Sequence, residues 1–435
     1  MSRDAALRAD ALSAVRRYAD EALAARGFVP GETTVPVAGR VIGAAELEAL
    51  VDASLDGWLT EGRFAARFAP AFARAAGRDH ALLVGSGSQA NLLAVAGACS
   101  RLLERPLAQG DEVITPALGF STTIAPLYQQ GLVPVYVDVE METLNPSLEA
   151  FAEAVGERTR GIMAAHCLGN PFDAAGLADL CAKRGLILIE DCCDALGSTL
   201  GGRPVGTFGQ VATYSFYPAH HMTTGEGGAV CADDPAWARA LGSLREWGRD
   251  CWCPPGVNDA CGRRFDGRHG DLPEGYDHKY VFSQLGFNFK VTDMQAALGL
   301  AQLDRLESFH AARRANFARL GHALEDLDDQ LLRVRATDGS DPSWFGYAFT
   351  LLEGGAERRT ALQRFLVERR IDSRLLLGGN LTRQPALAGL QHRISGALEN
   401  ADRVTEASLW VGCYPGLTEP MLDWIAESLR AFFGR

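Results

Sequence analysis

The chain has 435 residues, and its 47% of hydrophobic and 22% of charged residues are typical of a globular protein with a large core. A formal net charge of −12, without any cluster of Lys and Arg, argues against nucleic acid and anionic membranes as partners. We find neither a secretion signal nor an apolar stretch that could span a bilayer, so we expect a cytoplasmic protein. The ten cysteines are then expected to bind metal or fill the core rather than form disulfides.

Residues 1 to about 75 carry alanines at helical spacing between charged faces, which predicts helices joined by loops. From residue 80, short runs that are apolar on both faces alternate with helical stretches. This alternation predicts a mainly parallel sheet with helices on both sides. Ligands of such a sheet lie beyond the carboxyl ends of its strands. The expected strands are 81–84, 111–116, 133–139, 161–167, 186–191, 211–217 and 227–232.

The segment 248–280 interrupts this alternation with a long run that is rich in Gly and Pro and holds three cysteines. So long a loop in a compact domain is usually functional or disordered, and clustered cysteines favour a function. Helices resume near residue 292, and the apolar run 345–352 predicts a strand of a second unit. We therefore expect a large domain over residues 1–290, with the N-terminal helices and segment 248–280 included, and a smaller α+β domain over 291–435.

A strand, a glycine-rich turn and a helix follow one another in HALLVGSGSQANLLAVAGACS (80–100). The turn fits the dinucleotide pattern G-x-G-x-x-G/A, but the strand expected at 111–116 lacks the acidic residue that would hold a ribose. This absence argues against a nicotinamide site. The backbone N–H groups of Gly87, Ser88 and Gln89 at a helix N-terminus would still bind phosphate, and a plain tight turn is the alternative.

Three further motifs place polar residues at strand ends or before a helix. IEDCCDALGS puts Asp191 at the end of a strand, and TYSFYPAHHMTTGEGGAV puts Ser215 and His220 near the end of another. GFNFKVTDMQAALG puts Asn288 before a helix. From about residue 45 to its end, the chain thereby resembles the DegT/DnrJ/EryC1/StrS sugar aminotransferase family. The resemblance implies an α/β fold of the fold-type-I pyridoxal-phosphate (PLP)-dependent transferases, with a three-layer α/β/α large domain and a smaller α+β C-terminal domain.

The resemblance also implies how this chain would bind pyridoxal or pyridoxamine phosphate (PLP or PMP). Asp191 would pair with the ring nitrogen and keep it protonated, so that the ring can take up electrons. Phe120 would stack on the ring, and Asn288 would reach the phosphate of the neighbouring subunit, which implies a homodimer. Taken alone, Asp191 could be a helix N-cap and Phe120 a core residue. The phosphate ligands implied within the subunit are Gly87, Ser88, Gln89 and Ser215.

His220 stands where the family has the lysine that forms a Schiff base with the coenzyme. Imidazole cannot form that bond, so we expect PMP held without a covalent link and a proton moved by His220. The alternative is an inactive enzyme in which His220 is a relic. Asp194 also departs from the Gln or His usual in the family, and it is expected to contact the coenzyme ring or the substrate.

Four cysteines carry a second resemblance, within the same family. Their spacing, C-x57-C-x-C-x7-C, and the paired histidines of YPAHH resemble the 3-dehydratases of 3,6-dideoxysugar biosynthesis, whose four cysteines ligate a [2Fe–2S] cluster. Four thiolates also suit zinc, but the two C-x-x-C pairs usual in zinc sites are missing. Cys192 is the alternative to Cys193, because neighbouring strand residues point to opposite faces. The implied ligands are Cys193, Cys251, Cys253 and Cys261.

The chain is thus expected to be an enzyme that removes the C3 hydroxyl of a nucleotide-linked 4-keto-6-deoxyhexose, a 3-dehydratase that uses PMP and a [2Fe–2S] cluster. An external reductase, of the flavin/iron–sulfur or the ferredoxin/flavodoxin type, would deliver the electrons. One alternative is a cluster-free dehydratase that takes its electrons from an amine. Another is a non-catalytic sensor that binds PMP and a metal, but the acidic chain shows no DNA-binding module.

Overall fold

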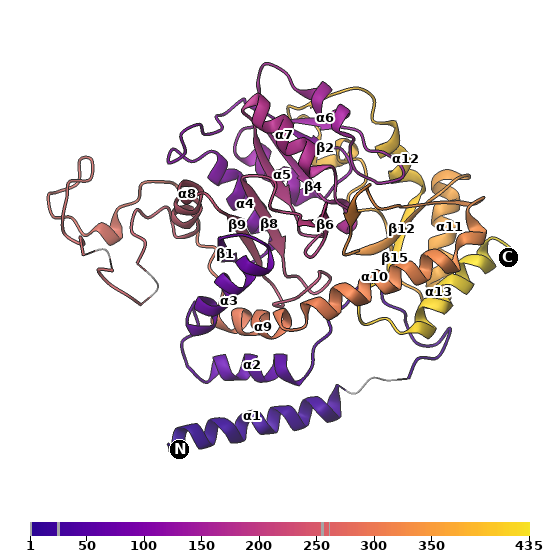
Figure 1. Ribbon diagram of the computed structural model, residues 1–435, viewed down its shortest axis with the longest axis horizontal. Coiled ribbons are helices and arrows are strands. Elements are labelled where there is room, and N and C mark those ends of the chain that lie inside the picture. The colour runs from indigo at the N-terminus through magenta and orange to yellow at the C-terminus, as the bar shows by residue number, and fades with distance from the viewer. Residues whose placement is uncertain (1, 24–26, 254–255, 261) are drawn as a thin grey trace.

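The computed structural model describes residues 2–23, 27–253, 256–260 and 262–435, and Figure 1 shows how its layers are arranged. An eight-stranded sheet forms the centre of the large unit. In spatial order its strands are β1 (His80–Val84), β9 (Gly228–Ala232), β8 (Val211–Ser215), β5 (Ile187–Asp191), β4 (Thr159–Ala165), β2 (Glu112–Pro116), β3 (Val133–Val137) and β14 (Arg393–Ile394). Strand β9 is antiparallel to both neighbours, and the other neighbouring strands are parallel. The predicted sheet is therefore confirmed, and each of the seven expected runs contributes a strand.

Helices cover both faces of this sheet. Alternate residues of a strand point to opposite faces, so Val113 of β2 packs in one cluster with Leu241, whereas Ile114 packs in another with Leu177. The three-layer α/β/α arrangement expected from the sequence is confirmed. The helices of the large unit are α3 (Arg63–Ala75), α4 (Gly87–Ala98), α5 (Ser121–Gln129), α6 (Leu148–Ala154), α7 (Ala174–Arg184), α8 (Pro235–Arg245) and α9 (Asp293–Leu303).

Two N-terminal helices, α1 (Arg3–Ala22) and α2 (Ala44–Ser54), lie outside these layers (Figure 1). Helix α2 packs on α9, and α1 packs on α2. Of α1, Ala19 alone is buried. Arg8 of α1 forms ion pairs with Asp52 and Asp56, each with an N–O distance of 2.5 Å. Helix α1 therefore buries little apolar surface, and ion pairs form part of its contact with α2.

The C-terminal part of the chain forms a smaller unit around an antiparallel sheet. Its strands, in spatial order, are β10 (Leu331–Arg333), β12 (Gly346–Leu351), β15 (Ser408–Gly412) and β13 (Ser373–Arg374). Its α-helices are α10 (Leu306–Ala323), α11 (Gly355–Glu368), α12 (Glu399–Ala407) and α13 (Glu419–Phe432). Contacts cross the expected border at residue 290, because β14 joins the large sheet and Val35 pairs with Ile371. The division at residue 290 stays a prediction.

The remaining elements are short. A small sheet contains β11 (Ser340–Asp341), β6 (Thr199–Leu200) and β7 (Arg203–Pro204). The 3-10 helices are η1 (Cys167–Gly169), η2 (His278–Tyr280), η3 (Glu325–Leu327), η4 (Leu381–Arg383) and η5 (Pro385–Leu387). The described residues of segment 248–280 follow α8 and extend away from the layers (Figure 1). None of the helices in the described ranges combines the length and the apolar character needed to cross a membrane.

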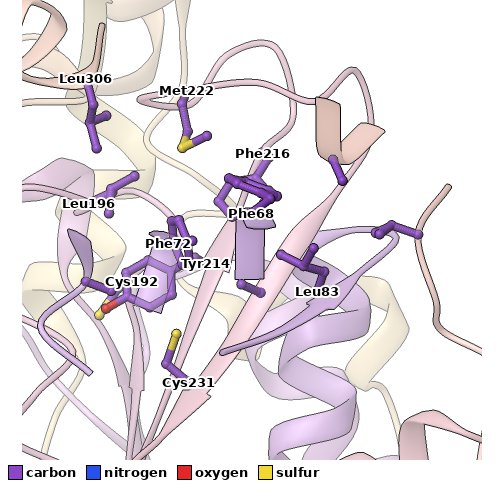
Figure 2. Close-up of a cluster of buried hydrophobic side chains, with 14 of the residues drawn as sticks. Phe68, Phe72, Leu83, Cys192, Leu196, Tyr214, Phe216, Met222, Cys231 and Leu306 are labelled. Atoms are coloured by element: carbon purple, nitrogen blue, oxygen red, sulfur yellow. The ribbon is translucent and has the colours of Figure 1, made fainter. Parts of the chain in front are cut away.

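An aromatic core under α3 fixes the loop that follows β8. Phe216 and Met222, at the two ends of this loop, are each 1% exposed and lie near Phe68 and Phe72 of α3 (Figure 2). The Phe216 ring meets the Phe72 ring edge-on, with 4.8 Å between their centres. Anchors on both sides of a short loop leave it little freedom, so the position of His220 between them is well defined.

Candidate active site

Asp191 ends β5, a central strand of the large sheet, and is 4% exposed. Its Oδ2 accepts hydrogen bonds from Asn91 Nδ2 at 2.9 Å and from Thr123 Oγ1 at 2.7 Å. Its Oδ1 accepts the backbone N–H of Cys193 at 3.1 Å. Two carboxylate oxygens have about four lone-pair sites, so Asp191 can accept one more donor. The arrangement fits the protonated ring nitrogen of the expected coenzyme.

The glycine-rich turn leads from β1 into α4. Ser86 is the N-cap of α4, and its Oγ accepts the N–H of Gln89 at 3.1 Å. Of the three N–H groups predicted to bind phosphate, that of Gln89 is thus already bonded. Gly87 and Ser88 place their N–H groups in the first turn of the helix, where the helix dipole favours an anion.

Gly87 lies where three segments meet. A Cβ atom at this position would lie 2.6 Å from Ser215 Cβ and 3.0 Å from Cys193 Sγ, so only glycine allows the approach. The ends of β8 and β5 therefore meet the start of α4, and the Ser215 hydroxyl lies beside the turn. This meeting point fits a phosphate held by backbone N–H groups and a hydroxyl.

Phe120 precedes α5 and is 53% exposed, so its ring is open to a planar ligand. Thr123, three residues later on the same helix, is buried and bonds Asp191. One helix thus positions an exposed aromatic ring and a hydrogen-bond partner of the buried carboxylate. The alternative of Phe120 as a core residue does not agree with its exposure.

His220 lies in the loop after β8, with its Nδ1 atom 3.4 Å from Asp194 Oδ1. Arg313 of α10 donates a hydrogen bond to the backbone carbonyl of His220 at 3.0 Å, and the ring of Phe345 is centred 5.1 Å from the imidazole. Burial lowers the pKa of His220 to about 4, and burial raises the pKa of Asp194 to about 7. The imidazole is then neutral at pH 7 and able to accept a proton.

Asn288 is exposed and lies in an extended stretch before α9, where it pairs with Glu246 in an isolated β-bridge. Its Oδ1 accepts a hydrogen bond from Lys290 Nζ at 2.8 Å. The hydrogen bonds of Asn288 described in this chain do not involve the turn at Gly87. A role of Asn288 at a neighbouring subunit stays a prediction.

The two adjacent cysteines after β5 point to different surroundings. Cys192 is fully buried and lies in the core near Tyr214 (Figure 2). Cys193 Sγ lies toward Gly87 instead. Burial raises the pKa of both thiols well above the ordinary value. Of the two, Cys193 is therefore the residue that faces the expected coenzyme.

Cys251 and Cys253 lie near the start of segment 248–280. The N–H of Cys253 donates to Cys251 Sγ at 3.5 Å, and the N–H of Ala260 donates to Cys253 Sγ at 3.3 Å, as occurs around iron–sulfur clusters. Cys261 lies outside the described residues. No group of three or more metal-ligating side chains within 4.8 Å joins Cys193 to this pair in the part of the chain that the structure describes. The pair fits one side of a cluster, and the four-cysteine set stays a prediction.

The model of the DegT/DnrJ/EryC1/StrS aminotransferase family matches residues 40–430. The chain belongs to this family. The resemblance drawn from the motifs around Gly87, Asp191, His220 and Asn288 is confirmed. Helix α1 lies outside the residues that the family model matches.

Named relatives within the family include 3-dehydratases. The lipopolysaccharide biosynthesis protein RfbH of Salmonella typhimurium is 50% identical over 97% of this chain and 96% of its own length. The dTDP-4-dehydro-2,6-dideoxy-D-glucose 3-dehydratase of Saccharopolyspora spinosa is 51% identical over 94% of this chain and 88% of its own. A solved GDP-4-keto-6-deoxymannose-3-dehydratase with a trapped PLP-glutamate geminal diamine has a TM-score of 0.82 and 29% identity, and the match covers 91% of this chain and 99% of that one. The fold is that of the PLP-dependent aminotransferases.

Sequence reasoning missed the residues of this family member that support the predicted ones. Asn91 and Thr123 bond Asp191, and Ser86 caps α4. The signal for Ser86 was present, because Ser in front of a helix is a common N-cap. Arg313 reaches His220 from 93 residues away. A local sequence pattern cannot predict a contact between residues so far apart in the chain.

Proposed function

We propose that the chain is a 3-dehydratase of a nucleotide-linked 4-keto-6-deoxyhexose that acts with PMP. The observation that carries this proposal is His220, a half-buried imidazole beside Asp194 in the loop after β8, where the family resemblance places a lysine. The names of the Saccharopolyspora spinosa relative and of the structural relative support the reaction class. An enzyme of this class removes the C3 hydroxyl, and the nucleotide sugar is its substrate.

In this proposal, different residues of the site bind the coenzyme and transfer the proton. Asp191 holds the proton of the coenzyme ring nitrogen, while Gly87, Ser88 and Ser215 hold its phosphate. When bound, PMP supplies an amine that condenses with the C4 ketone and a ring that takes up electrons. His220 Nδ1 lies toward Asp194, which leaves Nε2 to accept and return the proton. Removing the hydroxyl in exchange for hydrogen consumes two electrons and two protons and releases water.

A [2Fe–2S] cluster held by cysteines is the electron route that we propose. It would supply single electrons that an external reductase delivers. The thiols of Cys251 and Cys253 and their backbone N–H bonds support this part of the proposal. We also propose that the enzyme acts as a homodimer in which Asn288 serves the coenzyme of the other subunit. The four proposed cluster ligands are Cys193, Cys251, Cys253 and Cys261.

A cluster-free dehydratase is the second candidate. The structural relative with PLP and glutamate favours it, because an amino acid can deliver the electrons that the reaction needs. The positions of the cysteines favour this candidate as well, because Cys193 lies beside Gly87 whereas Cys251 and Cys253 contact each other in another segment. This candidate predicts turnover without iron and a requirement for an added amino acid.

Electron paramagnetic resonance of anaerobically purified, dithionite-reduced protein separates the two candidates. We expect the rhombic signal of a reduced [2Fe–2S] centre, lost in the Cys251→Ser variant and kept in Cys99→Ser, which changes the C-cap residue of α4. Protein without iron that still turns over a nucleotide sugar with an added amino acid would establish the cluster-free candidate. Protein that binds PMP but releases no 3-deoxy sugar under either condition would overturn the dehydratase proposal itself.

A further inference from the structure

Lys290 is enclosed by three acceptors. Its side chain is 10% exposed, and its ammonium donates to Asn288 Oδ1 at 2.8 Å and to Glu246 Oε2 at 3.0 Å. The ammonium also lies 3.4 Å from the ring centre of Trp247, a distance at which the aromatic face attracts a cation. An ammonium has three N–H donors, and these three neighbours account for all of them. Lys290 is therefore fixed in place rather than available to a ligand in solvent.

Trp247 adopts a backbone conformation that side chains rarely take. Its φ angle is +61°, in the left-handed region, which is an unfavourable place for so bulky a residue. Its N–H donates to the carbonyl of Phe287 at 2.6 Å, which ties it to the stretch that carries Asn288. Strain of this kind persists where the surrounding structure requires it, often at functional sites. Here the strained residue supplies the aromatic face under Lys290.

The contact with Lys290 decides which way the amide of Asn288 points. Lysine offers only donors, so the amide oxygen must face Lys290 and the amide nitrogen must face away from it. Asn288 is exposed, so its two N–H donors point to the outside of this chain. An amide held in this orientation offers hydrogen bonds to an anion and cannot turn its oxygen toward it.

We propose that Lys290 is a positioning residue, which fixes the amide of Asn288 so that its N–H donors meet the coenzyme phosphate of a second copy of the chain. The inference rests on the coenzyme and the homodimer of the proposed function, and it assigns Lys290 a task that does not involve the sugar substrate. Glu246 and Trp247 hold Lys290, and Lys290 holds Asn288. Without the ammonium, nothing in this contact prevents the amide from turning its oxygen toward the phosphate.

The test is the affinity of the full-length protein for PMP, measured by equilibrium dialysis. Lys290→Met keeps the stem of the side chain and removes its donors, and we expect a roughly tenfold weaker affinity. Lys290→Arg keeps a donor for the amide and should restore most of the affinity. In an Asn288→Ala background, Lys290→Met should weaken binding no further, because the two residues act as one unit. Lys183→Met, which removes the same charge from the exposed end of α7, is the matched control.

Each outcome counts for or against the inference. An equal loss from Lys290→Met with and without Asn288 would overturn it, since the lysine would then act on the phosphate by charge alone. Unchanged affinity in Lys290→Met would overturn it as well, and so would conversion of this variant to a monomer in sedimentation velocity. Lys290→Arg tests the inference should Lys290→Met fail to fold. Dialysis needs no sugar turnover, so wild-type protein that binds no PMP would mark a failure of the proposed function instead.

Discussion

The proposed coenzyme site around Asp191, called the pocket below, and segment 248–280 are built in different ways. In the pocket, Asp191 is 4% exposed, and side chains from α4 and α5 hydrogen-bond it. In segment 248–280, Trp252 and Phe265 are 63% and 60% exposed, and contacts at its surface such as the Arg264–Asp277 ion pair hold it together. The comparison teaches that buried hydrogen bonds within the fold position Asp191, whereas the described residues of the cysteine segment are held mainly by contacts at the surface.

The strongest test of the pocket removes its proposed base. His220→Asn keeps a polar side chain of similar size but cannot exchange a proton near neutral pH. We expect turnover of a nucleotide-linked 4-keto-6-deoxyhexose to fall by about 10²- to 10⁴-fold, the usual contribution of a general base. PMP affinity should stay within a factor of a few, measured by dialysis on the same preparation. Full activity of this variant would exclude His220 as the base.

Removing one hydrogen-bond donor to Asp191 should have a smaller effect than replacing His220. Thr123→Val keeps the shape of the side chain and removes one hydrogen bond to a buried carboxylate. We expect the free energy of unfolding to fall by about 1–3 kcal/mol, together with weaker binding of PMP. Denaturant titration with and without PMP measures both. Thr122→Val, one residue away on α5, is the control, and an equal effect of both variants would contradict the role of Thr123.

Metal removal should change the protease sensitivity of segment 248–280 more than it changes the binding of PMP in the pocket. Segment 248–280 has exposed tryptic sites at Arg263 and Arg268. A bound cluster would order this segment, so stripping iron with a chelator should speed tryptic cleavage there several-fold. PMP affinity should change less than the cleavage rate, because Asp191 and the turn at Gly87 are built on the sheet and Cys193 is the one proposed cluster ligand placed beside them. Cleavage at the same rate with and without iron, read by mass spectrometry, would argue that the cysteines of this segment hold no cluster.

The smallest expected effect concerns pH. Burial raises the pKa of Asp194 from 3.8 to about 7, so between these pH values the folded chain binds more protons than the unfolded chain. The stability that this carboxyl contributes is therefore present below pH 3.8 and is lost as pH rises through 7. Asp194→Asn cannot ionise, so it should raise the melting temperature by a few degrees at pH 8 and by less at pH 5. An equal shift at both pH values, measured by scanning calorimetry, would contradict the raised pKa of Asp194.

The sequence predicts residues whose role follows from chain position and leaves out residues that arrive through packing. The apolar runs place Asp191 and Ser215 at strand ends, which meet at one edge of a parallel sheet, and the family resemblance implies their roles at the coenzyme. Thr123 and Arg313 come from helices whose rotation and packing no local pattern fixes. The left-handed conformation of Trp247 was also beyond prediction, since local propensity opposes it.

High salt should weaken the contact of helix α1 with the rest of the enzyme, because this contact includes ion pairs. The contacts of α1 with α2 and the residues just after α2 include the Arg8 ion pairs and the pairing of Arg16 with Glu48, and of α1 Ala19 alone is buried. The Debye length falls to about 3 Å in 1 M salt, so exposed charges of this kind attract each other far less there. Concentrated salt should therefore expose the amides of α1 to hydrogen exchange while those of the central sheet stay protected. Buffers chosen for crystallisation or storage would then select between a docked and an undocked N-terminus.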